Sequence, residues 1–231
     1  MASQLALLLL QDLDPEVLDW GWIAENFWED IVPALQGHIF LSFISVAIAL
    51  VIALPIGVFV SRVPGAYAPV TFITGALYAI PSLAMFAILI SIGLPIGALP
   101  VIIALVAYSL LILIRNTAAG IDSVPAETID AARGMGLTGR QILMRVELPL
   151  AMPVIVAGIR IATVTIIGIA TIGAYIAGGG LGALIFDGIS RQFPTMIITG
   201  AALATLMAVV ADLGLLALER YLRPWSRVRR A

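Results

Sequence analysis

The chain has 231 residues, of which 61% are apolar and only 11% are charged, whereas about 25% of the residues in a typical soluble domain are charged. A water-soluble globule of this length could not cover so much apolar side chain with so little polar surface. The same composition excludes a disordered chain. It indicates an all-α integral membrane protein, because helices satisfy their own backbone hydrogen bonds in lipid.

The residue types that are missing exclude several kinds of chemistry. There is no cysteine, all 12 basic residues are arginine, and His38 is the single histidine. The first absence excludes disulfides and thiolate metal sites. The absence of lysine excludes a standard P-loop ATPase, which needs a lysine on its phosphates. A single histidine excludes multi-histidine metal sites. In line with these exclusions, we expect no catalytic residue, no metal site and no cofactor in this chain.

Five stretches are apolar enough to cross a membrane as helices, which takes about 20 residues. They run roughly over Ile39–Val60, Ala68–Ile92, Ala98–Ile114, Pro149–Ile176 and Met196–Leu218. A five-residue turn, residues 93–97, separates the second stretch from the third. We expect these two helices to be antiparallel neighbours.

The arginines predict how the spans are oriented, because cytoplasmic loops carry an excess of positive charge. With five spans, ten arginines fall on one side of the membrane, Arg191 falls on the other, and Arg160 lies within a span. Residues 1–30 hold seven acids and no arginine. We expect the N-terminus outside and the C-terminus in the cytoplasm.

Three regions follow from this layout: an extracytoplasmic segment (1–37), a transmembrane domain (38–222) and a basic cytoplasmic tail (223–231). In the first region, Asp14-Pro15-Glu16 is typical of a helix start. Trp20, Ile23, Phe27 and Ile31 then recur every three or four residues. This spacing predicts an amphipathic helix at the outer membrane interface, where tryptophan is favoured. A simple lead-in to the first span remains an alternative.

Residues 115–149 form the one long polar stretch between two spans, and we call them the polar segment. Pro125 suits the first turn of a short helix, with Glu127 and Asp130 near the positive end of its dipole. Gly134, Gly136 and Gly139 interrupt that helix, and Thr138 is a suitable cap for the next one. The polar segment is therefore predicted to be two short helices around a glycine turn.

The polar segment resembles the EAA loop of ABC-importer permeases. The family pattern is E-A-A, three residues, G, nine residues and I-x-L-P. This chain has Asp130-Ala131-Ala132, then Gly136, then Val146-Glu147-Leu148-Pro149 at the same spacing, with Asp in place of Glu and Val in place of Ile. The resemblance implies a type I importer fold whose cytoplasmic coupling helices dock on an ATPase subunit. It assigns this coupling role to Glu127, Asp130, Ala131, Ala132, Gly134, Gly136, Leu148 and Pro149.

Further motifs resemble the osmoprotectant permeases for glycine betaine, carnitine and choline. They include Arg115-Asn116-Thr117, Ile80-Pro81-Ser82-Leu83-Ala84 and Gly178-Gly179-Gly180-Leu181-Gly182, and the resemblance covers roughly residues 35–222. It implies import by alternating access in the plasma membrane of a prokaryote. The partners it implies are two ATPase subunits that hold ATP and Mg, a second permease subunit, identical or paralogous, and an extracytoplasmic substrate-binding protein. Membrane lipid surrounds the chain, and no nucleic acid is involved. Import of another small solute, such as an amino acid like methionine, remains an alternative.

Residues inside the spans are candidates for the solute pathway. Arg160 and Asp212 are intramembrane charges, which usually pair or line a polar cavity, and we expect a structural role in which they pair with each other or face the subunit interface. A quaternary ammonium is held mainly by cation–π contact. The aromatic and helix-opening candidates for this contact, each of which has simple packing as its alternative, are Tyr78, Pro81, Ser82, Phe86, Tyr108 and Tyr175.

Three further features of the sequence are candidates for a functional role, and two of them have an open alternative. Ile80-Pro81-Ser82 is expected to open the second helix locally and leave a carbonyl free toward the path. The glycines from Gly178 to Gly182 form either a flexible turn or a close approach to a gate or to the binding protein. Asp187 and Arg191 are four residues apart and either pair on one helix face or contact the binding protein.

Two other classes of protein are weaker fits. An intramembrane protease needs a Ser–His dyad, two facing aspartates or a zinc site, whereas Asp187 and Asp212 are assigned to opposite sides of the membrane. A membrane-anchored assembly or signalling protein does not predict a spaced EAA loop. Co-purification of an ATPase subunit would discriminate between these classes and an importer.

Overall fold

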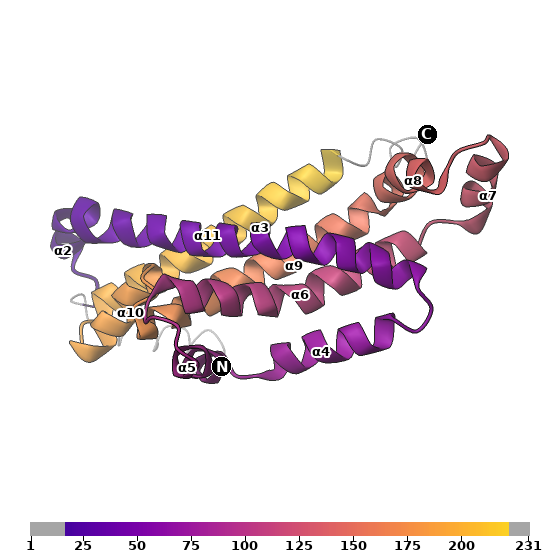
Figure 1. Ribbon diagram of the computed structural model, residues 1–231. Coiled ribbons are helices and arrows are strands. Elements are labelled where there is room, and N and C mark those ends of the chain that lie inside the picture. The colour runs from indigo at the N-terminus through magenta and orange to yellow at the C-terminus, as the bar shows by residue number, and fades with distance from the viewer. Residues whose placement is uncertain (1–16, 222–231) are drawn as a thin grey trace, which may run out of the picture.

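The computed structural model describes residues 17–221, and every regular element in that range is a helix (Figure 1). The tail at 223–231 and the helix start expected at Asp14-Pro15-Glu16 lie outside the described residues. The elements are α2 (Trp20–Glu25), η1 (Phe27–Ile31), α3 (Val32–Arg62), α4 (Tyr67–Ala79), α5 (Ser82–Ser91), α6 (Ala98–Asp122), α7 (Ala126–Gly134), α8 (Gly139–Ile142), η2 (Leu143–Glu147), α9 (Leu148–Gly173), η3 (Ala174–Ile176), α10 (Leu181–Ser190) and α11 (Pro194–Tyr221).

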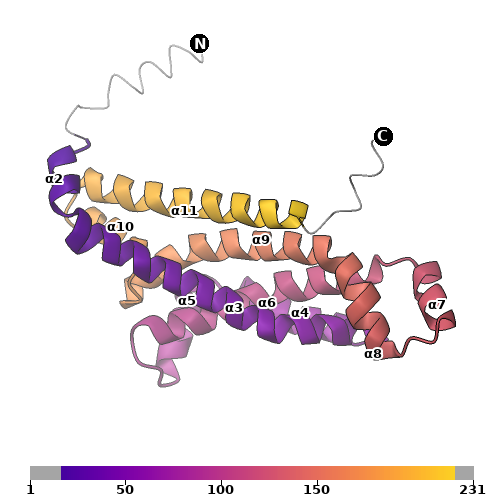
Figure 2. The ribbon, with the colours of Figure 1, turned by 90° about the horizontal axis from the view of Figure 1, so that it is seen from above.

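Helices α3, α6 and α9 form the centre of the bundle, with α6 packed against both of the others. Helix α4 lies along α6, and α11 lies along α9 (Figures 1 and 2). Glycines allow the close packing: a Cβ on Gly57 would lie 2.5 Å from Thr117 Cβ, and one on Gly158 would lie 2.3 Å from Asn116 Cβ. Small residues at such crossings let helix backbones approach within a membrane.

Helix length and composition give four to five membrane crossings in the described residues, where five were predicted. Four helical runs qualify on their own: Phe27–Arg62, Ala98–Asp122, Gly139–Ile176 and Pro194–Tyr221. The pair α4 and α5 qualifies only as a pair, so the described helices give four crossings, or five when the bent pair is counted as one span. The chain is a multi-pass, all-α membrane protein.

The second predicted span, Ala68–Ile92, is broken at the Ile80-Pro81-Ser82 opening that the sequence predicted. It is bent by 95° between α4 and α5. The cause is Pro81, which has no backbone N–H and pushes the preceding residue out of the helical region. Ile80 accordingly has extended angles, φ −68° and ψ 125°. Beyond the break, α5 turns inward and buries Met85 and Phe86 against the core.

The amphipathic helix expected before the first span is interrupted. The carboxylate of Asp19 accepts a hydrogen bond from the Trp22 backbone N–H and caps α2, which ends at Asn26. A π-helical turn, η1, then continues into α3. From Phe27 onward the segment is therefore a lead-in to the first span, which was the alternative to an amphipathic helix. Trp20 and Trp28 are 71% and 75% exposed, as the interfacial reading expects of tryptophans at a membrane surface.

Candidate functional site

The polar segment forms one end of the bundle, where α7 and α8 project beyond the long helices (Figure 1). Pro125 caps α7 from just before its first residue, one position earlier than predicted. Along α7, Glu127, Asp130, Ala131 and Gly134 are exposed, while Ala132 is 1% exposed and faces inward. Helix α7 therefore packs the small side chain of Ala132 against the protein and leaves the other four residues on the surface.

The turn between the two short helices depends on Gly136. Its φ is +82°, in the left-handed region that favours glycine. A Cβ placed there would meet no atom within 4 Å. Thr138 then caps α8 through a reciprocal capping box with Gln141, which confirms the predicted cap. The turn therefore favours glycine at this position, and the space around it is open.

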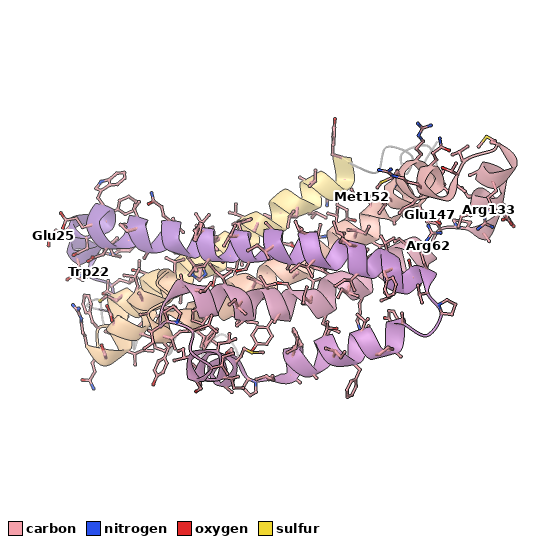
Figure 3. The ribbon with its side chains drawn as sticks, in the orientation of Figure 1. Trp22, Glu25, Arg62, Arg133, Glu147 and Met152 are labelled. Atoms are coloured by element: carbon pink, nitrogen blue, oxygen red, sulfur yellow. The ribbon has the colours of Figure 1, made fainter. Side chains whose placement is uncertain are left out.

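Glu147 ties the polar segment to the rest of the bundle. Its side chain is 3% exposed and forms an ion pair with Arg62, the last residue of α3; Figure 3 shows the two side chains meeting. Leu148, in the first turn of α9 beside Pro149, packs on a cluster that includes Ile121 near the end of α6. No pattern in the sequence indicated the Arg62–Glu147 pair, whose partners are 85 residues apart.

Arg160 and Asp212 pair, as predicted. Arg160 Nε donates to Asp212 Oδ1 at 2.9 Å, and Nη2 donates to Oδ2 at 3.0 Å. The guanidinium therefore binds the carboxylate through two parallel hydrogen bonds. Arg160 Nη1 also donates to Glu219 Oε2 at 3.1 Å. Glu219 was not anticipated, although its position seven residues after Asp212 puts both acids on one face of α11.

The charged pair lies in a groove of about 710 Å³ between α9 and α11. Helix α9 lines it with Ala157, Arg160, Ile161, Val164 and Thr165. Helix α11 lines it with Thr205, Ala208, Val209, Asp212 and Leu213. Both sets follow the spacing 0, 3, 4, 7 and 8, which is one face of an α-helix. The α9–α11 groove is thus bounded by two matching helix faces, apolar except for two threonines and the ion pair.

The aromatic candidates are divided between core and surface. Phe86 and Tyr108 are 0% and 2% exposed and belong to the central apolar cluster. The Tyr108 hydroxyl donates to the Ile80 carbonyl at 2.8 Å. The Ile80 carbonyl at the break is therefore already bonded. That another carbonyl of the break faces the path stays a prediction. Ser82 begins α5 just after the break.

The remaining two aromatics are exposed. Tyr78 meets the ring of Tyr108 edge-on at 6.1 Å between centroids. Tyr175 is 68% exposed and lies 5.7 Å from Phe186. Neither lines the α9–α11 groove. A pathway role for these aromatics remains a prediction.

The glycines after α9 pack on the chain itself. A Cβ on Gly180 would lie 2.9 Å from His38 Nδ1, and one on Gly182 would lie 1.9 Å from the Thr171 carbonyl. His38, 0% exposed, bonds through Nε2 with the Ile167 carbonyl at 3.0 Å. This close approach joins α3, α9 and the turn before α10. Asp187, on α10, and Arg191, the C-cap residue of that helix, are both exposed, and the described contacts include no ion pair between their side chains.

The chain is similar to known proteins in sequence and in fold. The family model described as "Binding-protein-dependent transport system inner membrane component" matches residues 45–228. The glycine betaine/carnitine/choline transport system permease protein OpuCB of Bacillus subtilis is 40% identical over 188 residues, 81% of this chain and 86% of that protein. The osmoprotectant import permease protein OsmW of Salmonella typhimurium is 41% identical over 191 residues, 81% and 89% of the two chains. An inward-facing structure of the MetNI methionine ABC transporter superposes with a TM-score of 0.75 at 25% identity, covering 83% of this chain and 95% of that one.

Proposed function

Since the chain belongs to the family of binding-protein-dependent transport system inner membrane components, we propose that it is the permease subunit of an ATP-driven importer for a quaternary-ammonium osmoprotectant. The observation that carries this proposal is the identity of about 40% to osmoprotectant and choline permeases over four fifths of the chain. The second candidate is an amino acid importer, which the resemblance to the methionine transporter favours at the lower identity of 25%.

The chain's part in the proposed reaction is mechanical. ATP and Mg bind to a separate pair of ATPase subunits, and this permease contributes no catalytic group. The exposed residues of α7 and the Gly136 turn form the docking surface for the ATPase, on the cytoplasmic side. Movement of that surface reaches α3 through the Arg62–Glu147 ion pair. It also reaches the core through the unbroken helical run Gly139–Ile176.

The remaining partners of the proposal follow from the same mechanism. A second permease subunit, identical or paralogous, completes the pathway, because one chain of five crossings does not enclose it. A substrate-binding protein delivers solute to the opposite end of the bundle, where α2 and α10 lie (Figure 2). Membrane lipid covers the outer helix faces.

The experiment reconstitutes the chain with its cognate ATPase and binding protein in proteoliposomes. Uptake of radiolabelled glycine betaine, choline, carnitine and methionine is measured with internal ATP, and a complex without ATP is the control. We expect ATP-dependent uptake of at least one quaternary-ammonium solute and none of methionine. Uptake of methionine alone would establish the second candidate instead, and absence of the ATPase from the purified complex would refute an importer.

A further inference from the structure

The α9–α11 groove presents charged side chains in the membrane-spanning part of the bundle. Asp212 is nine residues before the end of α11 at Tyr221, about 14 Å along the helix. The side chains of Arg160 and Asp212 are 23% and 36% exposed, even though they are paired. Charged groups at such depth normally face a protein interior or a water-filled cavity. Lipid tails are therefore a poor match for this surface.

We propose that the α9–α11 groove is a wall of the solute route and that Asp212 is the carboxylate that meets the ammonium group of a quaternary-ammonium solute. This inference rests on the proposed function and deepens it. Asp212 has the most exposed side chain of the three charged groups, at 36% against 23% for Arg160 and 11% for Glu219. A passing cation therefore reaches this carboxylate more readily than the others.

The chemistry of the groove suits such a cation. A quaternary ammonium has no N–H to donate, so it is held by charge attraction and by contact with its methyl groups. Asp212 supplies the charge, and Val164, Val209 and Leu213 supply apolar contacts. The lining contains no aromatic residue, so cation–π contact plays no part here. A volume of about 710 Å³ is within the range of small-molecule pockets, roughly 300–1,000 Å³.

Arg160 is a positioning residue in this scheme. Its two parallel bonds hold the Asp212 carboxylate in one orientation, and its third contact, to Glu219, places the guanidinium between two acids. The rival occupant of the groove is the second permease subunit, which would exclude both water and solute.

Accessibility to charged thiol reagents tests the proposal, because the chain has no cysteine of its own. Val209→Cys places a thiol in the groove, and Phe72→Cys places one on α4, where Phe72 is 76% exposed away from it. The assembled complex in proteoliposomes is treated with matched membrane-impermeant methanethiosulfonates, one bearing trimethylammonium and one bearing sulfonate. Each rate is divided by its rate with a free thiol in solution.

We expect the cationic reagent to label Val209→Cys about tenfold faster than the anionic one, since a charged cleft raises local counter-ion concentration at least that much. Phe72→Cys should react with neither. Adding Asp212→Asn should reduce the preference to about twofold or less, whereas Asp187→Asn, an exposed acid on α10 outside the groove, should leave it unchanged. Asp212→Glu should preserve it.

A protection experiment tests whether a quaternary ammonium binds in the groove, without any substitution of Asp212. Tetramethylammonium should slow labelling of Val209→Cys by the cationic reagent, and 3,3-dimethyl-1-butanol, a neutral molecule of similar shape, should not. No labelling at Val209→Cys, or a charge preference that survives Asp212→Asn, would overturn the proposal. Uptake by unlabelled Val209→Cys is measured in parallel. Quaternary-ammonium uptake without the labelling preference refutes the groove alone, and no such uptake by the unaltered complex refutes the proposed function.

Discussion

The substitution Gly136→Asp distinguishes two roles of Gly136: shaping the turn between α7 and α8, and allowing the ATPase to dock. The left-handed backbone at φ +82° costs a residue with a Cβ about 1–2 kcal/mol, and less for Asp, which tolerates this region. No atom lies within 4 Å of a Cβ at this position, so the chain itself does not resist the side chain. We therefore expect Gly136→Asp to insert into the membrane and keep its fold.

The substitution should weaken binding of the ATPase subunit far more than it destabilises the fold. A carboxylate buried without a partner at an interface costs about 3 kcal/mol or more, which is about a hundredfold in an association constant. Substrate-stimulated ATP hydrolysis by the reconstituted complex should fall accordingly. Gly139→Asp is the matched control, because Gly139 is exposed, has no positive φ and also has open space around it. Normal stimulation in Gly136→Asp, or an equal loss in both variants, would refute a specific docking role.

Three further predictions concern contacts that hold the bundle together, each measured as thermal stability of the purified chain in detergent. Arg62→Gln should destabilise more than Glu147→Gln, because it leaves a buried carboxylate without its cation; the reverse order would contradict a buried acid at this site. Tyr108→Phe should cost about 1 kcal/mol through the lost bond to the carbonyl at the helix break, and an unchanged melting temperature would show that bond to be dispensable. Gly180→Ala should destabilise more than Gly179→Ala, since both have positive φ but a Cβ only at Gly180 would meet a buried imidazole, at 2.9 Å; equal losses would assign the whole effect to the backbone.

Helix positions were largely predictable, because a membrane span is a property of one continuous apolar run. The last span was expected at Met196–Leu218 and is found at Pro194–Tyr221. The local chemistry of the polar segment was equally accessible: the turn at Gly136 and the cap at Thr138 depend on neighbours in sequence. The bend at Pro81 was anticipated in kind, but its angle of 95° depends on how α5 packs.

Contacts between distant segments were the hardest to predict. The pairing of Arg160 with Asp212 could be inferred, because each is a charge at similar depth in an otherwise apolar run. The partner of Glu147 could not, since in the sequence Arg62 is one of ten arginines that indicate only the orientation of the spans. The aromatics were chosen for their chemistry alone, and burial of Phe86 and Tyr108 is a result of tertiary packing that residue type does not reveal.

The polar segment and the α9–α11 groove are joined by a single helical run, Gly139–Ile176. Glu147 and Arg160 are 13 residues apart in it, about 20 Å along the axis. Between them the helix is weakened, because Pro149 and Pro153 each lack the N–H that an interior position would donate. The π-turn of η2, closed by a bond from Leu148 N–H to the Leu143 carbonyl, lies just before these prolines. A displacement of α8 therefore bends the run here more readily than at Arg160, where three bonds fix α9 against α11.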